Sequence, residues 1–106
     1  MITRRAGTRQ TCTVTRASDG STTIYVGQPY NIAGTGFKPG LSVKVQTIYL
    51  AFNWIDGTWS ITTDTYGGFS ITNNSGYNGS YSASVYSGST GALLTSCSYT
   101  LKALGT

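Results

Sequence analysis

The sequence predicts an all-β protein with an antiparallel sandwich fold, and three segments carry that prediction. Each segment places turn-forming residues next to an alternating apolar pattern, which is typical of the corners of antiparallel sheets. They are residues 34–40 (GTGFKPG), 63–70 (TDTYGGFS) and 79–86 (GSYSASVY). The chain has no sustained helical periodicity and no internal repeat. We therefore expect its 106 residues to form one β domain around a single modest core.

Short alternating runs separated by turns that contain Gly, Asn or Asp predict seven or eight strands. In order, they are residues 11–16, a short segment at 24–26, a strand near 29–36, residues 42–54, a segment at 59–61, a strand with Phe69 and Ile71, a strand with Tyr81 to Tyr86, and a last strand from Leu93 to Leu101. Alternation also predicts which side chains face the core. These are Cys12, Val14, Tyr30, Ile32, Tyr81, Ala83, Val85, Leu93, Thr95, Cys97, Tyr99 and Leu101.

Residues 42–61 contain two further signals. The apolar positions change parity along the strand: Val43 and Val45 share one phase, and residues 48, 50, 52 and 54 share the other. Because a shift of one residue moves side chains to the opposite face, we expect a bulge or a switch between sheets here. Asp56-Gly57, flanked by apolar residues on both sides, is the strongest hairpin signal of the chain, so we expect a tight turn there.

Composition favours a folded, weakly charged domain with a basic arm. Hydrophobic residues make up 39% of the chain and charged residues only 9%, which does not favour disorder. Four of the seven basic residues, including Arg4, Arg5 and Arg9, lie within the first sixteen positions. We therefore divide the chain into an arm, residues 1–10, and a domain, residues 11–106. Such an arm suits an acidic protein face or nucleic acid; a solvated terminus without a role is the alternative.

The inventory of reactive side chains does not favour catalysis. The chain has no His and no Glu, and its three carboxylates, Asp19, Asp56 and Asp64, fall in predicted turns, where Asp normally bonds its own backbone. No residue offers a base for a Ser or Cys nucleophile, and two distant Cys without His do not make a zinc site. We expect a non-enzymatic protein without metal or cofactor. No segment resembles a secretory signal or reaches membrane-spanning length, so we expect synthesis in the cytoplasm and no membrane partner.

The three turn segments together resemble the immunoglobulin-like modules of bacterial surface proteins and of tailed-phage virion proteins. The shared patterns are Gly-x-Gly-Phe-x-Pro-Gly, Thr-Asp-x-x-Gly-x-Phe-Ser and Gly-x-Tyr-x-Ala-x-Val, within residues 28–102. Residues 78–81 also resemble the tyrosine corner of such domains. The Cys-Trp-Cys arrangement of antibody domains is absent. The resemblance implies an immunoglobulin-like antiparallel β-sandwich of seven to eight strands.

The same resemblance implies a function. A small module of this type that stands alone is similar to phage capsid decoration (cement) proteins, which would place it on the virion surface. We expect its arm and the loops at one end to bind the major capsid protein or another virion protein, with a homo-oligomer around a lattice axis as one arrangement. A carbohydrate-binding or adhesive cell-surface module is the alternative. Nucleic-acid binding through the arm arginines ranks third, so nucleic acid is not the expected partner.

Two groups of residues remain as candidate sites. Cys12 and Cys97 lie on the first and last strands, which commonly run side by side in immunoglobulin-like sandwiches; a disulfide and two buried free thiols both fit. Aromatic residues are expected in loops or on outward faces, where their rings suit contacts with proteins or sugars, although core packing is the alternative for either Trp. These aromatics are Trp54, Trp59, Tyr66, Tyr77 and Tyr86.

Overall fold

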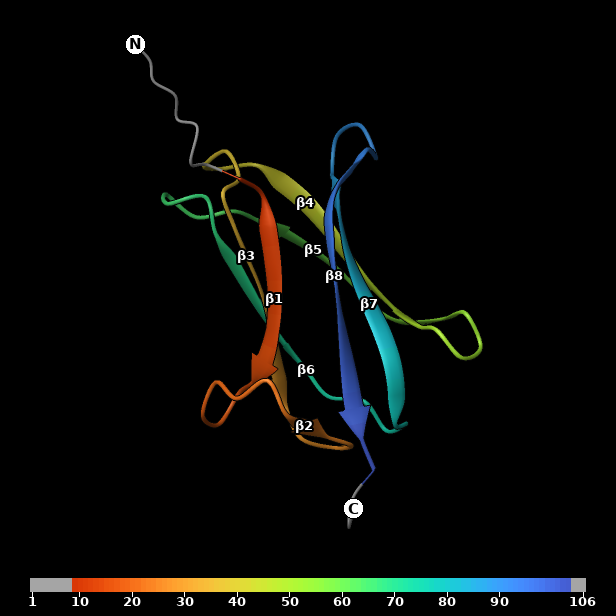
Figure 1. Cartoon of the computed structure of the whole chain (residues 1–106). Coiled ribbons are helices and arrows are strands. Elements are labelled where there is room, and N and C mark those ends of the chain that lie inside the picture. Colours follow the sequence, from red (N-terminus) through yellow and green to blue (C-terminus); the bar gives the residue numbers. More distant parts are fainter. Residues whose placement is uncertain (1–8, 104–106) are drawn as a thin grey trace.

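A computed structural model describes residues 9–103, and this part of the chain is entirely β, with no helix (Figure 1). The prediction of an all-β fold with seven or eight strands is confirmed. The strands are β1 (Thr11–Arg16), β2 (Ile24–Tyr25), β3 (Tyr30–Thr35), β4 (Ser42–Tyr49), β5 (Trp54–Thr62), β6 (Phe69–Asn73), β7 (Gly79–Ser87) and β8 (Leu93–Lys102). Residues 9–103 contain no helix that is long and apolar enough to cross a membrane.

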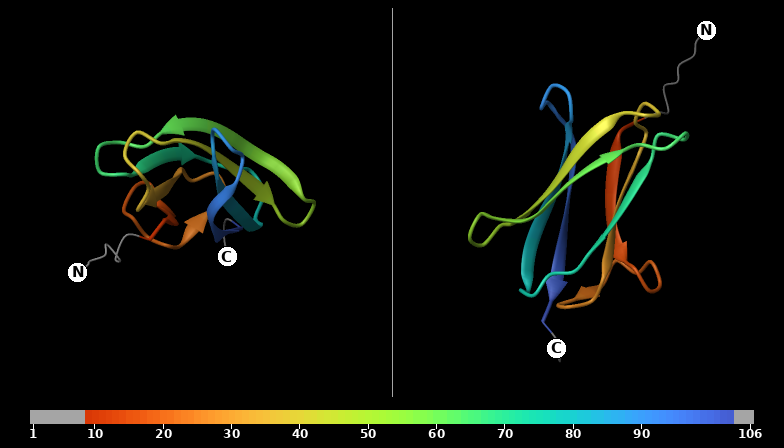
Figure 2. Two further views of the ribbon diagram at one scale, coloured as in Figure 1. Left: turned by 90° about the horizontal axis from the view of Figure 1, so that it is seen from above. Right: turned by 180° about the vertical axis from the view of Figure 1, so that it is seen from behind.

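The strands form two sheets that face each other. The smaller sheet has the order β1-β3-β6, and the larger has the order β2-β8-β7-β4-β5. The larger sheet curves over the smaller one (Figure 2). All pairs are antiparallel except β2 with β8, which is parallel, so the larger sheet is mixed and the expectation of a purely antiparallel fold is wrong at this strand. Strands β1 and β8 run in the same direction (Figure 1). Because β2 continues in the direction of β1, it pairs with β8 in parallel.

The core lies between the sheets and follows the predicted alternation in most strands. Tyr30 and Ile32 of β3 are fully buried, as are Tyr81, Ala83 and Val85 of β7. The expected tyrosine corner is also present, because the hydroxyl of Tyr81 donates a hydrogen bond of 2.6 Å to the carbonyl oxygen of residue 77. The inward phases of these two strands were therefore predictable from period-two patterning alone.

The predicted hairpin at Asp56-Gly57 is wrong. Strand β5 runs straight through these residues, and the turn that connects β4 to β5 lies at residues 50–53. Asn53 adopts a φ of 57° there, a left-handed conformation that Asn tolerates better than most residues. Asp56 instead is a bulge residue, because Thr47 pairs with Gly57 and Ile48 pairs with residue 55. Gly57 serves packing: a Cβ at this position would collide with the ring of Trp59.

The expected change of phase in β4 does not occur within the strand. After Val43 and Val45, the buried positions continue with Thr47 and Tyr49. Of the apolar residues of the other parity, Ile48 is partly buried, and Leu50, Phe52 and Trp54 are 49%, 61% and 47% exposed. The bulge lies in β5, the partner strand, so β4 keeps one inward face throughout.

A second bulge overturns the prediction that Leu93 faces the core. Val85 pairs with Thr95, whereas Tyr86 pairs with Leu93, so Leu94 is the extra residue in β8. Leu94 consequently packs against the core, and Leu93 is 59% exposed. Beyond this bulge, β8 regains the predicted phase, since Tyr99 and Leu101 are buried.

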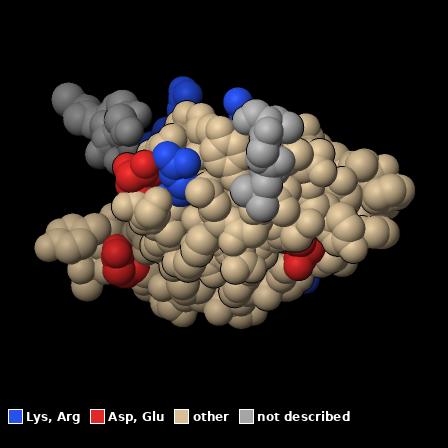
Figure 3. Space-filling view, turned by 90° about the horizontal axis from the view of Figure 1, so that it is seen from below, with Lys and Arg blue, Asp and Glu red and all other residues tan. Residues whose placement is uncertain are grey.

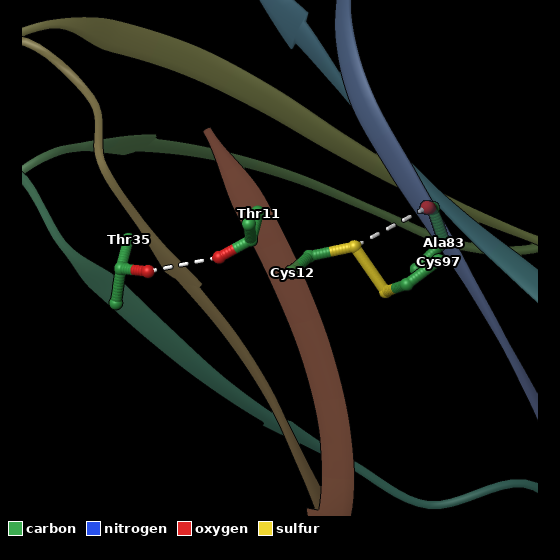
Figure 4. Close-up of a disulfide and its surroundings, with 5 residues drawn as sticks. All are labelled: Thr11, Cys12, Thr35, Ala83 and Cys97. Carbon is green, nitrogen blue, oxygen red and sulfur yellow. Dashed lines mark hydrogen bonds between the residues drawn. A yellow bond between two sulfur atoms is a disulfide. The ribbon is translucent and has the colours of Figure 1, made fainter. Parts of the chain in front are cut away.

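A disulfide joins the two sheets on the side where β1 lies next to β8 (Figure 4). It connects Cys12 of β1 to Cys97 of β8, whose Cα atoms are 5.7 Å apart. The sequence allows either a disulfide or two buried free thiols, and the structure has the disulfide. Cys12 Sγ lies 3.9 Å from the carbonyl oxygen of Ala83. Because a sulfur atom in a disulfide carries no hydrogen, this is a packing contact rather than a hydrogen bond.

Candidate functional site

Three exposed aromatic side chains gather where the β4–β5 hairpin meets the loop between β6 and β7. Phe52 comes from the hairpin turn, Trp54 begins β5, and Tyr77 lies in the loop; we call these three residues the aromatic platform. Their exposed fractions are 61%, 47% and 57%. The ring centroids of Phe52 and Trp54 are 4.8 Å apart and nearly parallel, and those of Trp54 and Tyr77 are 5.6 Å apart and nearly perpendicular. The platform is one continuous aromatic surface.

The platform is supported by a buried tyrosine. The ring centroid of Tyr49 lies 5.8 Å from that of each platform residue and 4.9 Å from that of Tyr81 in the core. The Tyr49 hydroxyl donates a hydrogen bond of 2.8 Å to the carbonyl oxygen of Asn78, which fixes the loop that carries Tyr77. The rings are thus held in place before any partner binds, and little side-chain entropy remains to be lost on binding.

Two exposed aliphatic residues neighbour the platform in the sequence. Leu50 and Ile55 flank the platform in sequence and are 49% and 61% exposed. The backbone N–H of Leu50 donates to the carbonyl oxygen of Ser80 at 3.0 Å, so the hairpin is attached to the start of β7. Charged side chains are few and scattered on the face of the molecule seen from below (Figure 3). Ile55 projects to the opposite face of β5 from Trp54, because successive side chains of a strand alternate, so the platform itself is an aromatic patch on a weakly charged protein.

The other predicted contact residues lie elsewhere. Trp59 points inward, is partly buried and packs against the core, so core packing, the alternative reading, holds for this residue. Tyr86 is half-buried in β7, on the outer face of the larger sheet. Tyr66 is 92% exposed, but it lies in the β5–β6 turn, far along β5 from Trp54. Of the predicted aromatics, the structure brings together only Trp54 and Tyr77.

The turn that presents Tyr66 is fixed by Asp64. One carboxylate oxygen, Oδ1, accepts the N–H of Tyr66 at 2.8 Å and the N–H of Gly68 at 3.0 Å. These backbone hydrogen bonds lower the pKa of Asp64. The turn also contacts the β3–β4 loop, because Phe37 N–H donates to the carbonyl oxygen of Gly67. The backbone of this turn is therefore fixed, and it carries the exposed ring of Tyr66.

The arm is described only in part. Arg4 and Arg5 lie outside the described residues, and Arg9 is exposed at the start of the described chain. The backbone of Arg9 lies against Gly36, where a Cβ would collide with the Arg9 carbonyl group. Gly36 has a φ of 85°, which favours glycine in the same way. Gly36 thus allows the backbone at Arg9 to pack closely against the end of β3.

Asp56 has a different role from the other two carboxylates. Asp19 accepts the N–H of Ser21 and forms an ion pair with Arg16, and that guanidinium lowers the pKa of Asp19 to about 2. Asp56, in contrast, does not bond its own backbone as predicted. Its Oδ2 accepts hydrogen bonds from Ser75 Oγ at 2.8 Å and from Asn73 Nδ2 at 3.2 Å. Because β5 and β6 are the edge strands of their sheets, these bonds connect the sheets on the side opposite the disulfide.

The network extends into the core through tyrosine hydroxyls. The hydroxyl of Tyr30 lies 2.7 Å from Ser75 Oγ and 3.1 Å from the hydroxyl of Tyr99. Burial raises the pKa of Tyr30 and of Tyr99, and it raises the pKa of Tyr81 to about 12. All three phenols are neutral donors at physiological pH. The network therefore links the sheets through hydrogen bonds between one carboxylate and neutral groups.

Residues 9–103 contain no cluster of three or more His, Cys, Asp or Glu side chains that would hold a metal ion. Ser75 is next to a carboxylate, but the sequence supplies no His to relay a proton, and Asp56 already accepts at least two hydrogen bonds.

The comparisons with known proteins concern the fold. A scan against protein-family models finds no match to this chain, and a search of curated proteins finds no similar sequence. Among solved structures, macromomycin is similar, with a TM-score of 0.58, 18% sequence identity, and coverage of 88% of this chain and 97% of that chain. At this identity the likeness shows a shared backbone fold over most of the domain, and it carries no information about function.

Proposed function

We propose that this chain is an immunoglobulin-like, non-enzymatic accessory virion protein that binds another virion protein through its aromatic platform. Strand order supports the immunoglobulin-like part: β1, β3 and β6 share one sheet, and β4, β7 and β8 share the other, as the corresponding strands do in such sandwiches. The tyrosine corner at Tyr81 supports it as well. The virion role rests on the sequence resemblance of the three turn segments.

The observation that carries the binding role is the platform itself. Soluble monomers rarely expose contiguous apolar patches of large side chains, and such patches commonly mark interaction sites. Here three half-exposed rings lie on a hydrogen-bonded floor, which is the composition and rigidity of a protein hot spot. The resemblance of the three turn segments to those of virion proteins favours a protein partner over a sugar.

The test has two parts. The first is the copy number of the protein in purified particles of the phage whose genome carries this gene; we expect a stoichiometric number. The second is co-sedimentation of purified protein with particles that lack it. Trp54→Ala should weaken binding by roughly 30-fold or more, the loss typical of a hot-spot residue of about 2 kcal/mol. Tyr66→Ala, a more exposed ring at the far end, is the matched control and should bind at least tenfold more tightly than Trp54→Ala.

The proposal fails if the protein is absent from purified particles, or if Trp54→Ala and Tyr66→Ala bind as the unchanged protein does. The basic arm belongs to the same proposal: removal of residues 1–8 should weaken particle binding and make it less sensitive to salt, because charge contacts between exposed groups are screened. If a DNA oligonucleotide competes with particles for the arm, nucleic acid is a ligand of the arm.

A further inference from the structure

A second candidate site lies away from the aromatic platform, on the outer face of the larger sheet. A groove of about 430 Å³ is formed where β4, β5 and β7 meet the turn between β7 and β8. The side chains that define it are Ser42, Lys44, Gln46, Ser60 and Tyr86. Its volume falls in the range of small-ligand sites, roughly 300–1,000 Å³.

Strand register assembles the floor of the groove. Lys44 in β4 pairs with Ser60 in β5 on one side and with Tyr86 in β7 on the other. Directly paired residues project to the same face with Cβ atoms about 4.5–5.5 Å apart, so these three side chains form one row across the sheet. Gln46 lies two residues along β4 on the same face. The row faces outward, because its neighbours Val43 and Val45 are fully buried.

The wall of the groove is built by a fixed turn. Gly88 N–H donates to the carbonyl oxygen of Ser42 at 2.8 Å, and Gly91 N–H donates to the carbonyl oxygen of Ser87 at 2.9 Å. A Cβ on Gly88 would collide with Ser42, so this glycine allows the turn to approach β4 closely. The Ser87 hydroxyl also accepts the N–H of Thr90 at 3.3 Å. The groove is therefore formed before a ligand binds.

The groove is electropositive and rich in hydrogen-bonding groups. No carboxylate lines it, and Lys44 forms no ion pair with any residue between 9 and 103, where the one ion pair joins Arg16 to Asp19. Lys44 therefore offers three donors and a positive charge to a ligand. Gln46 and the two serine hydroxyls add neutral donors and acceptors, and Tyr86 offers a half-buried ring beside them.

We propose that this groove binds a saccharide that carries a carboxylate, such as a uronic acid or a sialic acid residue. Lys44 pairs with the carboxylate, Gln46, Ser42 and Ser60 bond the sugar hydroxyls, and Tyr86 packs against the apolar face of the pyranose ring. This set of groups, one cation, several neutral hydrogen-bonding side chains and one ring, matches an acidic sugar better than a neutral sugar or a simple anion. The proposal concerns a surface that the aromatic platform does not share.

The experiment is a backbone amide NMR titration of the full chain with glucuronic acid and with N-acetylneuraminic acid at constant ionic strength. Shifts are expected at residues 42–46, 60 and 86–91, and none at the platform residues 52, 54 and 77. Glucose tests the need for the carboxylate, and acetate and inorganic phosphate test the need for the sugar. We expect each of these three probes to bind at least about tenfold more weakly than the acidic sugar.

Two variants and one control locate the site. Lys44→Gln removes the charge and should weaken the binding of glucuronic acid about tenfold, the typical effect of losing one hydrogen bond to a charged group. Lys44→Arg should restore most of the affinity. Lys38→Gln removes a lysine from the exposed β3–β4 loop and should bind as the unchanged protein does. Thermal unfolding of each variant checks that the fold is intact.

Several outcomes would overturn the proposal. Equal shifts with glucose, or equal shifts with acetate or phosphate alone, would show that the acidic sugar is not the specific ligand. Unchanged affinity in Lys44→Gln would remove the lysine from the site. Displacement of the sugar by a short DNA duplex at lower concentration would identify nucleic acid as the ligand of this face. Particle binding is expected to survive Lys44→Gln, so failure here and failure of the platform proposal are distinguishable.

Discussion

Removal of the disulfide should destabilise the domain more than any single contact in it. Cys12 and Cys97 are separated by 85 positions, so the bridge closes most of the chain into one loop. In the chain-entropy model, a loop of this length reduces the entropy of the unfolded state enough to stabilise the native state by about 4.6 kcal/mol at room temperature. A domain of this size has a total stability of about 5–15 kcal/mol. The bridge is therefore expected to supply a large share of it.

The assay is urea and thermal unfolding of three samples. They are the oxidised protein, the same protein reduced under denaturing conditions and refolded with reductant, and the Cys12→Ala/Cys97→Ala double variant. Reduction keeps the sulfur atoms, so the difference between the last two samples isolates the packing contribution of the thiols. We expect reduction to lower the unfolding free energy by about 4–5 kcal/mol and the melting temperature by on the order of 20 °C.

The folded structure itself should survive reduction. Strand β1 forms six residue pairs with β3, and Val14 packs against the core. These contacts do not depend on the disulfide, so we expect β1 to stay docked in the reduced protein. Refutation of the entropic reasoning would be a loss of less than about 1 kcal/mol on reduction. That result would mean that the unfolded chain is already compact around residues 12 and 97, so that the bridge removes little freedom.

Three further predictions concern the core and its polar network. The folded state raises the pKa of Tyr81 and of Tyr99 above the usual value of about 10. The free energy of unfolding should therefore stay level below about pH 10 and fall as the pH rises above it. The slope should reach up to about 1.4 kcal/mol per pH unit for each tyrosine that is still protonated in the native state. Tyr99→Phe should flatten this decline, measured by urea unfolding across alkaline pH. Asp56→Ala leaves its hydrogen-bond donors without an acceptor and should cost about 1–3 kcal/mol, measured by urea unfolding at neutral pH. Gly34→Ala places a methyl group against the buried ring of Phe69 and should cost about 1–3 kcal/mol, measured by thermal unfolding.

Matched controls accompany these changes. Gly76→Ala adds a methyl group where no atom lies within 4 Å and should change the unfolding free energy by less than about 0.5 kcal/mol. Thr58→Ala alters an exposed residue two positions from Asp56 and should be similarly mild. A stability that stays constant well above pH 10 would contradict the assignment of buried, neutral phenols, and a neutral Asp56→Ala would contradict its role in joining the sheets.

The alternation of apolar and polar residues correctly predicts the inward faces of regular strands without a bulge. The inward phases of β3 and β7 follow directly from Tyr30, Ile32 and Tyr81, since each of these strands lies between two others in its sheet and one of its faces is covered by the other sheet. Bulges account for the errors. At Asp56 and at Leu94, one extra residue reverses the phase of an otherwise alternating strand. The parity change in residues 42–54 indicates a bulge but not that the partner strand carries it, and no local signal marks the bulge at Leu94.

The candidate site is predictable only in part, because the turn between β4 and β5 lies elsewhere than the Asp-Gly pair indicates. Trp54 and Tyr77 stand out in the sequence as aromatics near turns. The sequence pattern puts Phe52 inside a strand, because the Asp-Gly pair indicates a hairpin turn at 56–57, beyond the actual turn at residues 50–53. The signal for the turn at 50–53, and so for the exposure of Phe52, is Asn53, because Asn tolerates a positive φ. The contact between the rings requires tertiary structure.

The two sides of the sandwich are fastened by different chemistry, and this asymmetry has a dynamic consequence. One side has a covalent link through Cys12 and Cys97, whereas the other is joined by hydrogen bonds that converge on Asp56. Local opening needs the least free energy where no covalent bond must break. Amide protons of β5 and β6 should therefore exchange with deuterated solvent sooner than those of β1 and β8. Transient separation of the layers would begin there, and the half of the domain around the sulfur bridge would stay closed.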